Sequence, residues 1–270
     1  MGRRRRNMKQ QFRICNASRM TEATREELSE AVRKGMDVSY NPSTDEMTFT
    51  FHDTSRYYPA VFDKNTIDGA RRIILTKENN VDTDTRWNRE TPALMDAMER
   101  AFGHNGTLVD YGCGIGRLSK GLCDIGFNVV GVDMSASMRR MAMDYVSSDR
   151  FSVVSPEEFK QMVADGFRCD FAIAVWVLQH CENPWMTFNL IRDSMKDGGL
   201  FFILNNSRGR ALPVVTNGQF SWRDDKLDVF GIIEANMEKV EDISLPPEAI
   251  GLKDEFYKAC LYRKPSNVQH

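Results

Sequence analysis

Hydrophobic and polar residues follow two different patterns, which meet in the first third of the chain. Before that point the residues are mostly polar, and acidic residues in a first turn predict one surface helix over Thr21–Lys34. Residues 47–51 (MTFTF) alternate like a short strand, and an aromatic group follows at residues 57–59. We interpret residues 1–85 as an accessory N-terminal region in which residues 1–20 are flexible.

Further along, apolar strand patterns and amphipathic helix patterns take turns. The expected strands are TLVDY, NVVGVD, FSVV, DFAIAVWVL and LFFILN. The expected helices are TPALMDAMERAF, LSKGLCDIG, SASMRRMAMDYV, PEEFKQMVADG and WMTFNLIRDSMKDGG, the last with Gly at its C-terminal end. Strands that alternate with helices form βαβ units, so the pattern predicts an α/β fold with a doubly wound, parallel sheet.

The C-terminal part is less regular. Residues 206–236 are rich in Arg, Asn and Gly, and we expect an irregular, lid-like insertion there, because long connections after a sheet strand often cover a site. The segments MEKVEDISL and FYKACLYRKP predict a final strand pair, with a loop at Pro246 and Pro247 between them.

Composition fits a globular chain: 270 residues are 41% hydrophobic, with a net charge of -2. No apolar run is long enough to span a bilayer, and the start MGRRRRNMKQ is not followed by the apolar segment of a secretory signal. We therefore expect a cytoplasmic protein without a membrane partner. The six cysteines show no C-x-x-C spacing and only four histidines are present, so neither a disulfide framework nor a metal site is predicted.

The charge is unevenly distributed. Residues 1–40 contain ten Lys/Arg and five Asp/Glu, so a basic head precedes an acidic remainder. The runs GRRRR and KQQFR could contact the phosphates of a nucleic acid or nucleotide. We favour a disordered, solubilising tail, because only Phe12 offers a stacking ring among the basic residues.

A glycine cluster lies where the first buried strand turns into a helix. In Val109-Asp110-Tyr111-Gly112-Cys113-Gly114-Ile115-Gly116 the glycines permit a tight turn and a close approach of a ligand to the backbone. The dinucleotide fingerprint requires Gly or Ala at the next position, and Arg117 stands there instead. The pattern therefore disfavours NAD while still indicating a nucleotide-like ligand.

Two carboxylates accompany the cluster. Asp110 ends the first strand, and Asp133 ends the second, 21 residues after Gly112. A carboxylate at that second position can accept hydrogen bonds from both hydroxyls of a ribose. The ligand is therefore expected to contain a nucleoside.

These residues also carry a family resemblance. VDYGCGIGRL followed by VVGVDMS resembles the first two motifs of the class I S-adenosylmethionine-dependent methyltransferases. DFAIAVWVLQHCENP and MKDGGLFFIL look like that family's fourth-strand and fifth-strand segments. The resemblance implies S-adenosylmethionine as cofactor and a mostly parallel, seven-stranded sheet whose last strand is antiparallel. We accordingly expect a methyltransferase domain over residues 86–265.

The resemblance also implies positions for the cofactor. Its methionine part would lie along the glycine loop with Asp110 near the ammonium, its ribose on Asp133, and its adenine between Met134 and the turn after the third strand. The residues implied in cofactor binding are Arg86, Trp87, Asp110, Gly112, Cys113, Gly114, Gly116, Asp133, Met134, Pro156, Glu157, Trp176 and Val177. Arg86 and Trp87 would lie near the methionine carboxylate, and Trp176 and Val177 beside the sulfonium.

Methyl transfer needs few catalytic groups, because the cofactor is already activated. His180, at the end of the fourth strand, is the candidate general base, with a structural role as the competing interpretation. Five residues of the expected lid favour an acceptor that is anionic or aromatic, with a merely solvated loop as the competing interpretation: Arg208, Arg210, Phe220, Trp222 and Arg223. We therefore expect O- or N-methylation of a small-molecule or metabolite-like acceptor.

Two alternatives stay open. An RNA- or nucleotide-modifying methyltransferase is disfavoured, because an Asp/Asn-Pro-Pro-aromatic motif is absent after the fourth strand and no cysteine follows a proline. A catalytically idle, cofactor-binding scaffold subunit would explain the extra N-terminal region and the lack of a decisive base. The sequence gives no indication of oligomeric state.

Overall fold

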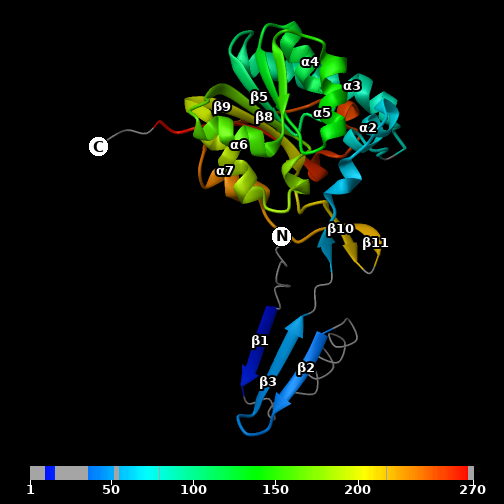
Figure 1. The fold of residues 1–270 in the computed structure, drawn as a ribbon, viewed down its shortest axis with the longest axis vertical. Coiled ribbons are helices and arrows are strands. Elements are labelled where there is room, and N and C mark those ends of the chain that lie inside the picture. The colour runs from blue at the N-terminus through cyan, green and yellow to red at the C-terminus, as the bar shows by residue number, and fades with distance from the viewer. Residues whose placement is uncertain (1–9, 16–35, 52–54, 79, 217, 267–270) are drawn as a thin grey trace. The chain divides into compact units, whose positions relative to one another are not determined.

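The structure is a computed structural model, and it describes residues 10–15, 36–51, 55–78, 80–216 and 218–266. The chain forms two compact units, whose elements are labelled in Figure 1. The first unit comprises Met1–Arg56 and Val215–Gln219, and the second comprises Tyr57–Val214 and Phe220–His270. The second unit therefore begins within the region that we expected to be accessory.

A three-stranded antiparallel sheet in the order β1-β3-β2 belongs to the first unit. Its strands are β1 (Gln10–Cys15), β2 (Met36–Asn41) and β3 (Glu46–Phe51). The strand predicted over residues 47–51 is confirmed as part of β3. Within residues 1–20, only 10–15 are described, and they form a strand where we expected a flexible tail. The helix predicted over Thr21–Lys34 lies outside the described residues.

The second unit is built on a seven-stranded sheet in the order β12-β13-β9-β8-β5-β6-β7. Its strands are β5 (Thr107–Tyr111), β6 (Asn128–Val132), β7 (Phe151–Val154), β8 (Cys169–Val175), β9 (Met195–Asn206), β12 (Glu238–Asp242) and β13 (Tyr257–Arg263). The five adjacent strands β9, β8, β5, β6 and β7 are parallel, whereas β13 is antiparallel to both of its neighbours. The predicted doubly wound sheet and its antiparallel last strand are confirmed.

Helices connect the strands and lie on both faces of this sheet (Figure 1). They are α2 (Ile67–Ile74), α3 (Thr83–Phe102), α4 (Arg117–Asp124), α5 (Ala136–Val146), α6 (Pro156–Ala164), α7 (Pro184–Ser194), α8 (Val229–Glu234) and α9 (Pro247–Ile250). Short 3-10 helices are η2 (Pro59–Phe62), η3 (Leu178–His180) and η4 (Asp254–Phe256). Among the described residues, no helix is both long and apolar enough to cross a membrane.

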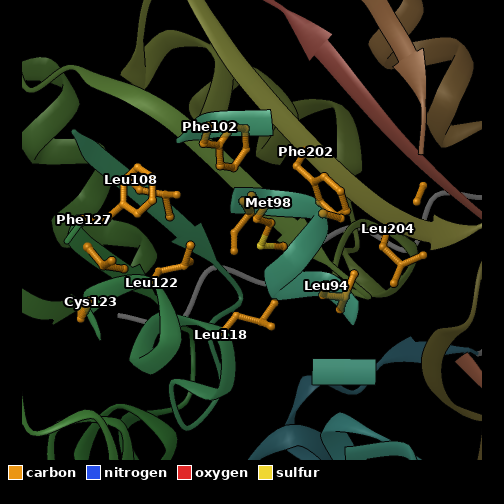
Figure 2. Packing of buried hydrophobic residues seen from close by; sticks show 14 of the residues in the cluster. Leu94, Met98, Phe102, Leu108, Leu118, Leu122, Cys123, Phe127, Phe202 and Leu204 are labelled. Carbon is orange, nitrogen blue, oxygen red and sulfur yellow. The ribbon is translucent and has the colours of Figure 1, made fainter. Parts of the chain in front are cut away.

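Two hydrophobic layers form the core, one on each face of the sheet. Alternate residues of β9 divide between them, with Phe202 and Leu204 in one layer and Phe201 and Ile203 in the other. Figure 2 shows the first layer, where Leu94, Met98 and Phe102 of α3 approach Phe202 and Leu204. Strands buried on both faces explain why their sequences are continuously apolar rather than alternating.

The helix predicted over residues 185–199 is shorter than expected, because α7 ends at Ser194. Met195 already pairs with Cys169 of β8. The amide of Gly198 donates to the carbonyl of Lys264 over 2.9 Å, and the amide of Lys264 donates to Gly199, also over 2.9 Å. Backbone groups that bond between strands are not available to a helix, so this segment joins β9.

Residues 206–236 are more regular than we expected. They contain β10 (Leu212–Thr216), β11 (Gln219–Arg223) and α8, and β10 lies between β11 and β4 (Arg56–Tyr57). The β-branched residues of LPVVT favour a strand, and Asp228 caps α8 by accepting the amide of Gly231 over 2.9 Å. The predicted final strand pair is confirmed as β12 and β13.

Candidate functional site

The glycine loop joins β5 to α4 at the carboxyl end of the parallel strands. Gly112, Gly114 and Gly116 all have positive φ, at 79°, 57° and 81°. The amide of Gly112 donates to the carbonyl of Val132 at the end of β6 over 2.7 Å. The loop is therefore held against the second strand, at the sheet edge where open α/β folds bind their ligands.

Close packing makes glycine necessary at two of these positions. A Cβ at Gly112 would lie 2.3 Å from Val177 Cγ2, and a Cβ at Gly116 would lie 2.3 Å from Val146 Cγ2. The Sγ atom of Cys113 lies 2.9 Å from the place of a Cβ on Gly131, so this side chain packs on β6. The Cys113 thiol is therefore enclosed within the fold.

Asp110 is a buried carboxyl beneath the loop. Ser119 of α4 donates to it over 2.6 Å, and the side chain is almost fully enclosed. Burial raises the pKa of Asp110 to about 6, although the Ser119 hydrogen bond and the charge of Arg117 act in the opposite direction. This group therefore changes charge just below neutral pH.

Asp133 follows β6 and faces the same loop. Its two carboxylate oxygens accept the amides of Gly114 and Ser135, each over 2.9 Å. Burial raises the pKa of Asp133, and these two hydrogen bonds oppose the shift. Each carboxylate oxygen has a second lone pair, so the group can accept two further hydrogen bonds from a ligand.

The predicted adenine-side residues lie beside this carboxylate. Met134 is 48% exposed, which leaves its side chain free to cover a planar ring. The amide of Asp133 donates to the carbonyl of Val154 over 3.2 Å, and α6 starts two residues later at Pro156. Glu157, in the first turn of α6, is exposed.

Arg86 and Trp87 are buried in α3, behind the loop. Arg86 donates to the carbonyl of Thr76 over 2.8 Å and to Glu90 over 2.9 Å, while its Nε atom has no hydrogen-bond partner within the described part of the chain. Two guanidinium groups lie over the ring of Trp87, that of Arg71 at 4.9 Å and that of Arg117 at 5.6 Å from the ring centroid. The site thus has a cationic, enclosed side.

Trp176 and Val177 follow directly after β8. Val177 fills the space above Gly112, whereas Trp176 has a positive φ of 60° and donates its indole N–H to Glu90 over 2.9 Å. Sequence reasoning missed Glu90, since a single acid within an amphipathic helix pattern gives no sign that it is buried.

Both ring nitrogens of His180 are hydrogen-bonded. Nδ1 lies 2.6 Å from the carbonyl oxygen of Ala211 and must donate to it. Gln179 accepts the amide of Asn206 through its own carbonyl oxygen over 2.7 Å, so its NH2 group faces His180 Nε2 at 3.1 Å. Burial lowers the pKa of His180 to about 4, so the ring is neutral at physiological pH.

An aromatic group surrounds this histidine. Phe62 of η2 and Trp222 of β11 lie 5.2 Å and 5.3 Å from the His180 ring, centroid to centroid. Phe220 lies 5.1 Å from Trp222, and Tyr58 lies 6.3 Å from Phe220. Tyr58, Phe220 and Trp222 are each exposed by 42–43%, so the aromatic group combines a packed ring wall with accessible ring surface.

The expected cationic part of the lid is divided. Arg210 is buried and forms an ion pair with Asp225, so its charge is already neutralised within the fold. Arg208 and Arg223 are exposed. The structure therefore brings Trp222 to His180 and packs Phe220 against Trp222, while the predicted Arg210 is held in an ion pair with Asp225.

The segment from η2 to α2 contacts both His180 and the residues around Asp133 and the glycine loop. Phe62 contacts His180, and the neighbouring Asp63 accepts a hydrogen bond from Ser135 over 2.7 Å and another from Ser137. A Cβ on Gly114 would lie 2.7 Å from Ile74 Cδ1 of α2. We expected this segment to be accessory, and no sequence signal indicated that it covers the glycine loop.

The family model and the curated relatives that match this chain are described as methyltransferases. A sequence family described as a methyltransferase domain matches residues 86–214. A ubiquinone biosynthesis O-methyltransferase of Glaesserella parasuis is 28% identical over 121 residues, which cover 43% of this chain and 50% of that protein. One of Methylobacterium is 33% identical over 113 residues, covering 40% and 45%. The chain thus spans about half the length of the curated relatives it matches.

Solved structures share the fold at low sequence identity. The N-methyltransferase NodS of Bradyrhizobium japonicum, in complex with S-adenosylhomocysteine, has a TM-score of 0.53 and 15% identity, and the match covers 75% of this chain and all of that one. Magnesium protoporphyrin IX methyltransferase of Synechocystis, also with S-adenosylhomocysteine, has a TM-score of 0.54 and 15% identity, covering 76% and 96%.

Proposed function

We propose that this chain is a class I S-adenosylmethionine-dependent methyltransferase, which binds S-adenosylmethionine and methylates a small molecule. The match of residues 86–214 to a family described as a methyltransferase domain supports this. The methyl group goes to an oxygen or nitrogen atom of the acceptor. Relatives named as O-methyltransferases and a fold neighbour named as an N-methyltransferase support both atoms.

The observation that carries the proposal is the pairing of Asp133 with the glycine loop. A carboxylate with two unused lone pairs lies beside a loop where a side chain at Gly112, Gly114 or Gly116 would meet a neighbour. A ribose hydroxyl pair and a narrow thioether-bearing chain suit these two features. The residues present therefore fit the cofactor.

The other predicted residues follow from that placement. The orphaned Nε atom of Arg86 and the excess of guanidinium groups around Glu90 favour an anionic group, which is the methionine carboxylate in our proposal. Asp110 faces the ammonium once it is ionised. Met134, Pro156 and Glu157 border the adenine, while Trp176 and Val177 border the sulfur.

When bound, S-adenosylmethionine would supply a methyl group on a positively charged sulfur. An acceptor lone pair would form the new bond to that methyl carbon while the carbon–sulfur electron pair returned to the sulfur. The chain's own task is to hold both partners aligned and to exclude water. His180 does this as a neutral ring wall in our proposal, because its lone pair is already used and its pKa is about 4.

The acceptor in this proposal is a planar aromatic molecule. Phe62, His180 and Trp222 present rings at the end of β8, and described carboxylates nearby, such as Asp63, are already hydrogen-bonded. Aromatic rings pack well on such a surface. An acceptor whose nucleophilic atom ionises in solution, or carries a free lone pair, needs no base from the protein.

The direct test is a calorimetric titration with S-adenosylhomocysteine, followed by transfer of a labelled methyl group from S-adenosylmethionine to catechol- and aniline-type acceptors and their saturated-ring analogues. We expect saturable cofactor binding and transfer to aromatic acceptors only. Absence of binding would contradict the proposal at its base. Binding without turnover on any acceptor would instead support an idle scaffold.

Trp222→Ala tests the acceptor surface separately. We expect the KM for an aromatic acceptor to rise about two- to tenfold, the loss of one aromatic contact, while S-adenosylhomocysteine affinity is unchanged. Trp185→Ala is the matched control, since Trp185 is equally exposed, at 43%, but belongs to α7. Equal effects of the two substitutions on KM would argue against this surface.

A further inference from the structure

The geometry points to Glu90 as a positioning residue that shapes the methionine end of the cofactor site. The inference rests on the proposed function and assigns a role to a residue outside the predicted site. Glu90 touches neither cofactor nor acceptor in this account. It acts through Trp176 and Arg117, which it holds in place from behind the glycine loop.

Glu90 lies in α3 and is 0% exposed. Its Oε1 atom accepts the indole N–H of Trp176 over 2.9 Å and Nη2 of Arg117 over 3.1 Å. Its Oε2 atom accepts Nη2 of Arg86 over 2.9 Å. A buried carboxylate with three donors, two of them cationic, makes strong, charge-assisted hydrogen bonds and fixes its partners' orientations.

The hydrogen bond to Trp176 controls a strained part of the backbone. Trp176 has a φ of 60°, a region that bulky residues rarely occupy. Such a conformation persists only where surrounding contacts impose it, and these residues concentrate at functional sites. The amide of Trp176 also donates to Leu204 over 2.7 Å, so the residue is fixed at its backbone by β9 and at its ring by Glu90.

The remaining bonds of Glu90 join other segments around the same loop. Arg117 is the first residue of α4, directly after Gly116. Arg86 also holds the carbonyl of Thr76, after α2, over 2.8 Å. One carboxylate therefore connects α3, the start of α4, the end of β8 and the segment that follows α2.

The charges around Glu90 favour one kind of ligand group. Two buried guanidinium groups face one carboxylate in the cluster, which leaves it with an excess positive charge beside the loop. In our proposal the carboxylate of the cofactor's methionine part is attracted to that excess. Removal of the Glu90 charge, while its volume is kept, would add to this positive charge. It would also misplace Trp176 and both arginines, and in our proposal this loss of alignment outweighs the added attraction.

Glu90→Gln tests this against a merely stabilising role, with two ligands titrated into the full-length protein. S-adenosylhomocysteine carries the amino-acid part, and 5′-methylthioadenosine lacks it. We expect the Kd of S-adenosylhomocysteine to rise about tenfold or more, the scale of a lost charge-assisted hydrogen bond, and the Kd of 5′-methylthioadenosine to change less than about twofold. Glu99→Gln, on the exposed end of the same helix, should change neither.

Equal weakening of both ligands, or no weakening of either, would overturn the inference while wild-type binding keeps the proposed function intact. A wild-type chain that binds neither ligand would remove both. Should Glu90→Gln not fold, Trp176→Phe removes the indole N–H along with part of the ring, and it must still weaken S-adenosylhomocysteine more than 5′-methylthioadenosine.

The indole N–H of Trp176 gives a readout that does not need the cofactor. In a protein with 15N-labelled tryptophan, the resonance missing in Trp176→Phe identifies this group. It should shift in Glu90→Gln and stay in place in Glu99→Gln. An unshifted resonance would mean that Glu90 does not position Trp176.

Discussion

The two halves of the proposed site are built in different ways. The cofactor half, around Asp110, the glycine loop and Asp133, comes from two neighbouring strand ends and is held by backbone hydrogen bonds. The acceptor half brings Phe62, His180 and Trp222 together from three distant parts of the chain, and ring packing holds them. The first half is polar and local, and the second is aromatic and non-local.

The difference separates what a local motif can specify from what only contacts between distant residues can assemble. Directional hydrogen bonds require certain residues at fixed spacing, so the cofactor half follows a motif. A ring wall can be assembled from aromatic residues of any segment that reaches the site, which allows the acceptor half to vary. Substitutions should therefore act strongly in the first half and weakly in the second.

The largest effect is expected for Gly112→Ala. A Cβ there would lie 2.3 Å from Val177, and φ is 79°, so conformational strain and overpacking together should cost about 2–4 kcal/mol of unfolding free energy. Urea denaturation measures it. Gly198→Ala is the control, because its φ is 77° but no atom lies within 4 Å of the new Cβ. Equal losses in the two variants would mean that contact with Val177 is unimportant.

Next in size is Asp133→Asn. The amide keeps one acceptor for a backbone N–H and loses the charge that ribose hydroxyls favour, so the Kd of S-adenosylhomocysteine should rise about 10- to 100-fold. Calorimetry gives this value. Asp124→Asn, which removes only an exposed partner of Lys120, should leave affinity unchanged. A Kd for Asp133→Asn close to that of the wild type would mean that the ribose does not bind to this carboxylate.

A smaller effect concerns pH. The pKa of Asp110 is about 6, so the group is protonated and neutral below that value and negative above it. A cationic ammonium binds better beside the negative form, so affinity for S-adenosylhomocysteine should fall about tenfold from pH 7 to pH 5. Asp110→Asn should show a flatter profile. A profile as steep as that of the wild type would assign the pH dependence to another group, such as Asp133.

The smallest effect is expected for His180→Asn. The asparagine amide can replace Nδ1 as a donor to Ala211, and no proton transfer is lost if the ring is only a wall. We expect kcat to fall about threefold or less, whereas removal of a general base typically costs about 10²- to 10⁴-fold. The wild-type rate should show no ionisation from His180 above pH 5.5. A large fall in kcat would restore His180 as the base.

The sheet predicted from the sequence is confirmed, and the residues proposed for the cofactor half rest on signals of the same local kind. Glycine spacing, the acids at two strand ends and continuous apolar strands are local signals, and the structure brings Asp110, Gly114 and Asp133 together as expected. Local signals are misleading where pairing with distant strands determines the secondary structure. The sequence of Met195–Gly199 is typical of a helix, but this segment pairs with neighbouring strands.

The acceptor half could not be predicted in the same way. Trp222 was a candidate on composition alone, and nothing in the pattern connected Phe62 or the α2 segment to the glycine loop. Glu90 was missed for a related reason, since its burial depends on Trp176 and Arg117, which lie far from it in sequence. Contacts between distant residues leave no periodic trace in one sequence.

A crystal structure of the chain with S-adenosylhomocysteine bound tests the central claim most directly. The account predicts both ribose hydroxyls within hydrogen-bond distance of the Asp133 carboxylate, the amino-acid part along the glycine loop, and the sulfur beside Trp176 and Val177. A ligand bound elsewhere, or one whose ribose does not contact Asp133, would contradict it.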